Sequence, residues 1–359
     1  MMTAIKIDSI VCFTSDDEVF IEPLIKTLSK VSKNILFLYS DYFLGGDLQN
    51  QEILNKILSL KDKYDGIEFL KYEIDFSMQE KDNINGPNGI SWKRYWISIG
   101  RKKGMEYLKR TKNSDWILIL DSDEYPEPDL FNEWKYENLN LLSNNLQNQG
   151  LLAINFYNYV YYWKPTYQAL EYENSIIMVK PEVLESKYED ILVNEWDRTA
   201  YLFFLPDDKV KIGVLNKDNL PLFHHYSWVR QPDLMLNKIK NWGHSDDHLS
   251  IEITYECPGD DTIKYTMNKV TFHYSVSNYI GYKIFKPEKS LQFYEYYMMA
   301  INKEFCKFKI LNNEQDNPLL NEFKTFMLTP SIENAEKLLI CNRKLKLSEN
   351  KFNININMI

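Results

Sequence analysis

The sequence has no long hydrophobic run and little cysteine, and each absence restricts what the protein can be. No apolar stretch approaches the roughly 20 residues of a membrane-spanning helix, and the opening MMTAIKIDSIVCF contains no apolar core of a secretion signal. The four cysteines are scattered and form no C-x-x-C pair, which disfavours a disulfide framework or a zinc site. We therefore expect a soluble cytoplasmic protein with no transmembrane segment.

An excess of basic charge is also missing. The 359 residues carry a formal net charge of −9, and such an acidic balance argues against a nucleic-acid partner. It leaves anionic small molecules possible, because a bound metal ion would supply positive charge locally. The hydrophobic content of 44% and the charged content of 26% are typical of a globular protein. The chain is long enough for one large domain with additions, or for two domains.

The first third of the chain alternates between two patterns. Strands are expected at residues 5–14, 34–40, 66–75 and 116–120. The first has an apolar centre, the second and fourth are mostly apolar, and the third alternates between apolar and polar residues. Between them, apolar residues at helical spacing predict helices near residues 20–28, 48–60 and 91–110, the last of them strongly basic. This alternation predicts an α/β fold with a mostly parallel sheet and helices on both faces.

After about residue 125 the pattern becomes less regular. Strands are expected at residues 151–163 and 175–180, and helices at 139–149 and 233–240. We expect the main domain to end near residue 250. A hairpin-like insertion at 251–290 and a mostly helical C-terminal extension at 291–359 follow it.

The most informative stretch is DWILILDSDEYPEPD, residues 115–129. Its buried strand ends in Asp121, Asp123 and Glu124, and we expect Pro126 and Pro128 to prevent further sheet pairing. Carboxylates about 5–6 Å apart repel by roughly 3 kcal/mol per pair at an effective dielectric near 20. A divalent cation relieves that repulsion, and hard oxygen ligands suit Mg²⁺ or Mn²⁺. The alternative is a solvated acidic turn with no ligand.

Taken together, these segments resemble the GT-A glycosyltransferases, particularly family-2-like enzymes. The resemblance lies in a second strand followed by Asp41, a basic helix and an apolar strand ending in D-S-D, over roughly residues 5–250. The later HHYSWVR and KIKNWGHSDD are similar to the histidine segment of relatives, some of them N-acetylglucosaminyltransferase-like. The resemblance implies a Rossmann-like nucleotide-binding half at about 1–125 and an acceptor-binding half at 126–250.

The same resemblance assigns roles to individual residues. Asp41 would contact the nucleotide base, Asp121 the ribose or the metal, and Asp123 would bind Mn²⁺ or Mg²⁺ directly. Either His224 or His225 would complete the metal site, and His225 is favoured because YSWVR follows it. Further donor-binding candidates are Thr14 at the end of the first strand and the basic residues Lys93, Arg94 and Arg230, each of which has a solvated surface charge as its alternative.

Inversion at the sugar requires a general base on the acceptor hydroxyl, commonly a carboxylate. Glu195 or Asp197 is the first choice for this base, and Asp246 or Asp247 is the second. The alternative role for Asp197 is a structural ion pair. His244 and His248 flank the second pair, and form either a second metal site or a solvated polar turn.

The sequence therefore predicts a metal-dependent glycosyltransferase that uses a nucleotide-sugar, UDP-linked, and a saccharide or glycoconjugate acceptor. A nucleotidyltransferase is disfavoured because the turn after the first strand, TSDD, lacks the glycines of a phosphate loop. A non-catalytic carbohydrate-binding protein on a degenerate GT-A fold is the third reading. The identity of the sugar, the acceptor and the oligomeric state are not fixed by these patterns.

Overall fold

The computed structural model describes residues 5–78, 92–140, 150–162, 167–185 and 205–230, with positions 234, 237, 238 and 241 and six short strands beyond residue 250. The chain divides into two compact units. The first comprises Met1–Val160, Tyr172–Tyr226 and Asn241–His244, and the second comprises Tyr161–Glu171, Ser227–Lys240 and Ser245–Ile359. The candidate site lies in the first unit.

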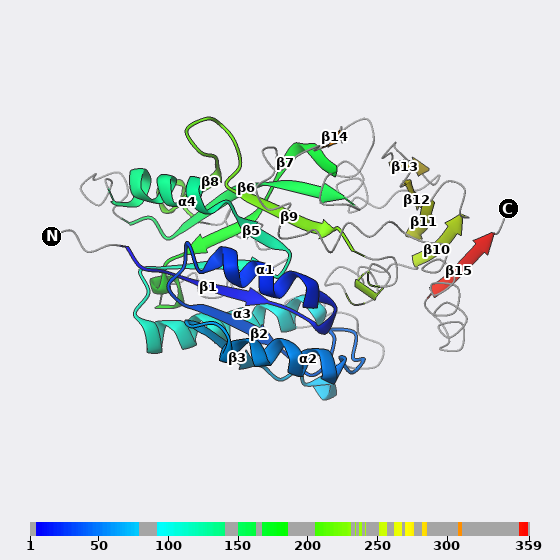
Figure 1. Cartoon of the computed structure of the whole chain (residues 1–359), viewed down its shortest axis with the longest axis horizontal. Coiled ribbons are helices and arrows are strands. Elements are labelled where there is room, and N and C mark those ends of the chain that lie inside the picture. The colour runs from blue at the N-terminus through cyan, green and yellow to red at the C-terminus, as the bar shows by residue number, and fades with distance from the viewer. Residues whose placement is uncertain are drawn as a thin grey trace. The chain divides into compact units, whose positions relative to one another are not determined.

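The first unit begins with a parallel half-sheet (Figure 1). Its strands lie in the order β3-β2-β1-β4 and all pair in parallel. These strands are β1 (Ile7–Cys12), β2 (Ile35–Tyr39), β3 (Ile67–Lys71) and β4 (Trp116–Asp121). Because β1 and β4 are covered on both faces, residues such as Ile10, Val11 and Leu118 are completely buried.

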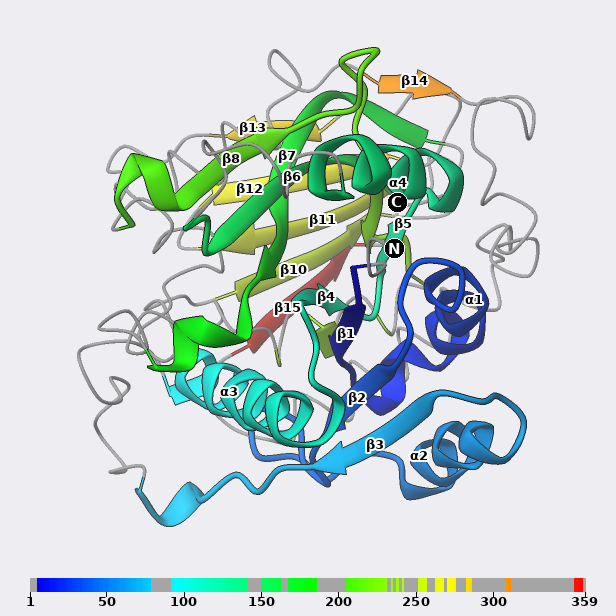
Figure 2. The ribbon, with the colours of Figure 1, turned by 90° about the vertical axis from the view of Figure 1, so that its left-hand side faces the viewer.

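Helices cover both faces of this half-sheet. They are α1 (Glu18–Leu28), α2 (Gln51–Leu58) and α3 (Trp92–Lys112). Figure 2 shows α3 on one face and α1 with α2 on the other. Asn50 caps α2 by accepting hydrogen bonds from the backbone N–H groups of Glu52 and Ile53, at 3.1 and 3.2 Å. The predicted α/β class is therefore confirmed, with each of these elements near its expected position.

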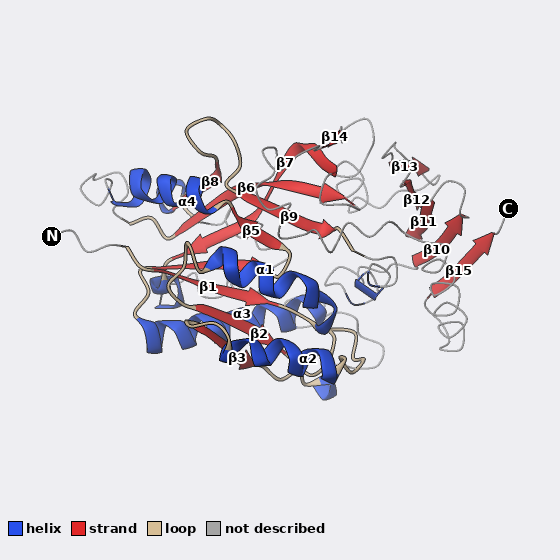
Figure 3. Ribbon diagram, viewed as in Figure 1, coloured by secondary structure: helices blue, strands red, loops and turns tan. Residues whose placement is uncertain are grey.

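The sheet continues beyond β4 with antiparallel pairings (Figure 3). The order runs β4-β7-β6-β9-β5, with β8 beside β6. The strands are β5 (Glu124–Pro126), β6 (Ala153–Tyr162), β7 (Tyr167–Val179), β8 (Val210–Val214) and β9 (Phe223–Trp228). Strand β7 is antiparallel to β4, and β5 is antiparallel to β9, whereas β6 and β8 are parallel.

The expectation that Pro126 would prevent sheet pairing is wrong. Pro126 pairs with Phe223, and it is tolerated because β5 stands last in the strand order, where a strand has one unpaired edge. Pro128 instead begins helix α4 (Pro128–Lys135), which continues into a π-helical turn, Tyr136–Asn140. The sequence did not predict α4. The helix expected at 139–149 falls almost entirely outside the described residues.

Helix α4 closes the hydrophobic core over β6 and β9. The ring of Phe131 lies 5.4 Å from that of Phe223, and the ring of Trp134 lies 4.9 Å from that of Phe156. On another strand face, Tyr125 and Tyr226 make an edge contact, and the Tyr125 hydroxyl donates to the backbone oxygen of Phe20 in α1. These aromatic contacts fix β5 and β9, the two strands that carry the candidate site.

The second unit contains a five-stranded sheet in the order β13-β12-β11-β10-β15. Its strands are β10 (Ile251–Glu256), β11 (Thr262–Met267), β12 (Val270–Ser275), β13 (Tyr282–Phe285) and β15 (Phe352–Asn357), and β14 (Phe308–Ile310) pairs with β7. Between 291 and 359 only β14 and β15 are described, so the helical extension stays a prediction. In the described parts of the chain, no helix combines the length and hydrophobicity needed to cross a membrane.

Candidate functional site

Strand β5 brings the acidic turn after β4 against β9. In this antiparallel pair Glu124 stands opposite His225, and Tyr125 stands opposite His224. The backbone N–H of Tyr226 also donates to the carbonyl oxygen of Asp123, at 2.8 Å. Residues about 100 positions apart in the sequence therefore meet at the end of β4.

Asp123 and His225 form the centre of this site. The Asp123 side chain is 3% exposed, and its Oδ1 lies 3.5 Å from Nε2 of His225. Burial, the largest single influence, lowers the pKa of His225. A hydrogen bond with Asp123 and the negative charges of Glu124 and Glu173 outweigh burial, so the pKa of His225 lies above its ordinary value. The imidazole is thus strongly coupled to the acidic turn.

Glu124 lies behind this pair and is fully buried. Its Oε2 accepts a hydrogen bond from the backbone N–H of Asp121 at 2.7 Å, and its Oε1 accepts one from the Ser175 hydroxyl at 2.8 Å. The Ser175 hydroxyl and backbone N–H each lie 3.1 Å from Oδ1 of Asn158. The Glu124 carboxylate therefore connects the end of β4 to the interior of β7.

Asp121 has a different partner from Asp123. Its Oδ1 accepts a hydrogen bond from the guanidinium of Arg101 on α3, at 3.1 Å, and its side chain is 38% exposed. The expected repulsion between these carboxylates is thus offset by separate partners, Arg101 for Asp121 and His225 for Asp123. A shared cation is not required to explain why three acidic residues occupy this turn.

His224 points away from Asp123. Its Nε2 lies 3.7 Å from Oε2 of Glu127, and its ring lies 5.2 Å from that of Tyr159. Successive residues of a strand project to opposite faces of the sheet, so only one of the two neighbouring histidines can meet Asp123. That residue is His225.

The donor-binding candidates in the loops after the first two strands are engaged with neighbouring side chains. The Thr14 backbone N–H and hydroxyl both donate to Asp17, at 2.8 and 3.0 Å. Asp41 forms an ion pair with Lys71, at 2.5 Å. Between these two loops lies the buried Gln49, which accepts from the Ser15 N–H and donates to the carbonyl oxygen of Ser40. No pattern in the sequence pointed to Gln49.

All three basic candidates are buried, but they do not all belong to the same unit. Lys93 and Arg94 are buried on α3, 9% and 8% exposed, so neither is a solvated surface charge. Arg230 is buried too, but it belongs to the second unit. The proposed bases Glu195, Asp197, Asp246 and Asp247, and the histidines His244 and His248, lie outside the described residues.

Two further residues of the site were not predicted. Arg101 is seven residues after Arg94, which places both on one face of α3, so the helical spacing contained a signal for it. Glu173 lies on β7 with Oε2 3.9 Å from Nδ1 of His225 and a side chain that is 40% exposed. No sequence signal pointed to Glu173, because its position depends on the β6–β9 part of the sheet.

The Asp123–His225 pair is compatible with a divalent metal. Two ligands about 2.1 Å from one ion stand roughly 3–4 Å apart, and the pair is separated by 3.5 Å. Across the described residues, no group of three or more His, Cys, Asp or Glu side chains forms a complete metal cage. Mg²⁺ usually retains several waters and is bound by one or two carboxylates together with substrate phosphates, so a partial ligand set suits it.

No family model and no curated protein sequence matches the chain. Among solved structures, it is similar to the apo structure of WbbM, a bifunctional glycosyltransferase, with a TM-score of 0.37 and 11% identity over 69% of this chain and 52% of that chain. It is also similar to LgtC, a galactosyltransferase with donor and acceptor sugar analogues, with a TM-score of 0.33 and 9% identity over 67% and 94%. GlyE, a glycosyltransferase in Streptococcus pneumoniae, gives a TM-score of 0.31 and 14% identity over 62% and 54%. The chain thus spans about half the length of WbbM and GlyE.

Proposed function

We propose that this chain is a GT-A glycosyltransferase that moves a sugar from a UDP-linked donor to a saccharide or glycoconjugate acceptor, with inversion. The observation that carries the proposal is the Asp123–His225 pair at the end of β4, beside the buried Glu124. In α/β sheets, the carboxyl ends of parallel strands are the usual place for a nucleotide ligand.

Asp123 and His225 would hold Mn²⁺ or Mg²⁺. Such an ion, when bound, offsets the negative charge that develops on a departing nucleoside diphosphate. Arg101 places a fixed positive charge beside Asp121, and the buried Lys93 and Arg94 lie about two turns earlier on the same helix. These side chains would orient the diphosphate and add to the stabilisation of its charge.

The remaining donor contacts and the base follow from residue chemistry. Asp41 would bind the nucleotide base and Asp121 the ribose, with Thr14 at the neighbouring loop. Glu195, Asp197 and Asp247 stay candidates for the general base. Glu173 joins them, because its carboxylate is partly exposed and lies on the side of the imidazole opposite Asp123.

The test is release of UDP from a panel of UDP-sugars, measured with saccharide acceptors and with Mn²⁺, Mg²⁺ or EDTA. Activity should require the metal, and Asp123→Asn and His225→Asn should each lower turnover by about 100-fold or more. Asp208→Asn is the control, since that side chain is 72% exposed and lies away from the acidic turn in the sequence. UDP release that survives both EDTA and the Asp123 substitution would contradict the proposal.

Two other outcomes would identify a different function. Pyrophosphate release from a nucleoside triphosphate would indicate a nucleotidyltransferase. Glycan binding in calorimetry that neither nucleotide nor Mn²⁺ alters would indicate a carbohydrate-binding protein without transferase activity.

A further inference from the structure

The fully buried Glu124 is the feature of the site that the proposed mechanism does not use. Burying a carboxylate costs free energy unless its oxygens receive hydrogen bonds, and both oxygens of Glu124 do. One bond reaches the end of β4 through the Asp121 N–H, and the other reaches β7 through Ser175. Its own backbone pairs with His225 on β9. Three strands therefore converge on this side chain.

Two hydrogen bonds of Glu124 depend on the reach of its side chain. These bonds, of 2.7 and 2.8 Å, go to neutral donors. The imidazole of His225 is farther away, with Nε2 at 3.9 Å from Oε1, which is beyond hydrogen-bond distance. Asp123 follows Asp121 by two residues, so a fixed Asp121 backbone also fixes where the Asp123 carboxylate emerges.

We propose that Glu124 is a positioning residue, whose two acceptor oxygens hold the turn after β4 so that the Asp123 carboxylate stays against His225. This inference rests on the proposed function, because it assigns Glu124 to the site that binds the metal and the donor. Glu124 itself would touch neither ligand. It acts through the Asp121 backbone and through Ser175.

A glutamine at position 124 retains this geometry. Its amide oxygen still accepts from the Asp121 N–H, while its NH₂ group donates to the Ser175 oxygen. The Ser175 hydroxyl then donates to Oδ1 of Asn158, which lies 3.1 Å away. An aspartate retains the charge but is one methylene shorter, so it cannot reach both donors.

The experiment compares Glu124→Gln with Glu124→Asp, by titrating each purified protein with Mn²⁺ and following free Mn²⁺ by electron paramagnetic resonance. Glu124→Gln should bind Mn²⁺ within about threefold of the wild type, whereas Glu124→Asp should bind about 10- to 100-fold more weakly, as is typical when a partner of a metal ligand is lost. Thermal melting of each variant separates weak binding from unfolding. If Glu124→Asp fails to fold, Ser175→Ala provides the second test, since it removes one hydrogen bond and should weaken Mn²⁺ binding in the same direction.

Two results would overturn the positioning role. One is Mn²⁺ binding by folded Glu124→Asp, or by Ser175→Ala where the former does not fold, that equals the wild type. The other is a loss in Glu124→Gln as large as that in Glu124→Asp, which would show that charge is what matters. A wild-type protein that binds no Mn²⁺ would instead overturn the metal-dependent function, and the role of Glu124 with it.

Discussion

Some buried side chains in this protein make several hydrogen bonds at once. Glu124 does so at the candidate site, and Asp8 does so at the opposite end of the parallel strands. Asp8, at the start of β1, is 1% exposed. One of its oxygens accepts from the backbone N–H and the side-chain amide of Asn34, at 2.9 and 2.7 Å, and the other accepts from the Ser114 hydroxyl. It thereby joins the loops that precede β2 and β4.

Replacing Asp8 with alanine should lower the free energy of unfolding by about 3 kcal/mol, because three donors lose their acceptor in a buried place. Urea denaturation measures the change. Asp62→Ala, on an exposed turn, is the control and should stay within about 0.5 kcal/mol of the wild type. An equal effect of both substitutions would mean that the Asp8 bonds add nothing to stability.

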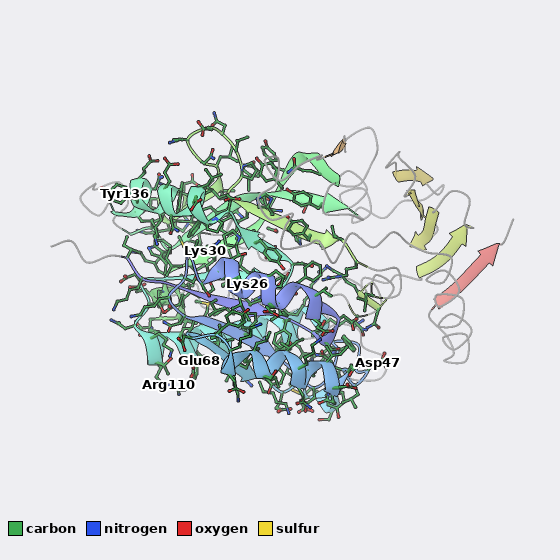
Figure 4. All side chains as sticks on the ribbon, viewed as in Figure 1. Lys26, Lys30, Asp47, Glu68, Arg110 and Tyr136 are labelled. Carbon is green, nitrogen blue, oxygen red and sulfur yellow. The ribbon has the colours of Figure 1, made fainter. Side chains whose placement is uncertain are left out.

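Helices and strands join through charged contacts as well as through the apolar core. Glu68 on β3, which Figure 4 labels, accepts hydrogen bonds from Lys112 and Tyr107 of α3. Burial is the largest influence on the pKa of Glu68 and raises it, but the bonds from Lys112 and Tyr107 outweigh burial and lower the pKa below 4.5. The folded protein therefore favours the ionised carboxylate.

This pKa shift predicts how stability changes with acidity. A carboxyl group whose pKa is lowered by folding adds stability above its unfolded pKa, and this contribution disappears as the pH falls through the folded pKa. Between about pH 6 and pH 3, the wild type should therefore lose more stability than Glu68→Gln does. Urea midpoints across that range measure the difference, with Glu106→Gln, an exposed carboxylate on α3, as the control. Parallel curves for wild type and Glu68→Gln would contradict the prediction.

Across the whole molecule, local patterns predicted the parallel half-sheet well and the antiparallel half poorly. Strand β2 and all but the last residue of β4 are continuous apolar runs, and such runs are visible without knowledge of their neighbours. Strand β5 is three residues long and contains Pro126, so only its pairing with β9 defines it. The choice between His224 and His225 depends on the register of that pair, and a shift of one residue would exchange them.

The partner of Asp121 required similar long-range information. The sequence predicted that the carboxylate lies at a strand end and that the preceding helix carries a row of basic residues. It did not indicate which guanidinium contacts the carboxylate. Arg101 does so because of how α3 packs across β1 and β2. The identity of the acidic turn was thus accessible from the sequence, whereas its contacts were set by tertiary packing.

Ligand binding should raise the stability of the whole protein. A donor held at 100 times its dissociation constant adds about 2.7 kcal/mol to the free energy of unfolding. A thermal-shift screen of nucleotide-sugars should therefore give a clear rise in melting temperature for one class, larger with Mn²⁺ than without. Asp123→Asn should abolish the metal-dependent part of that rise. Equal shifts for wild type and variant would show that the metal binds elsewhere.

The pairing of β5 with β9 also determines when the site forms during synthesis. A ribosome adds roughly 5–20 residues per second, so about 5–20 seconds separate the emergence of Asp123 from that of His225. During that interval Asp123 has emerged but His225 has not. A growing polypeptide that stops short of β9 would lack the Asp123–His225 pair, however well its parallel strands had already assembled.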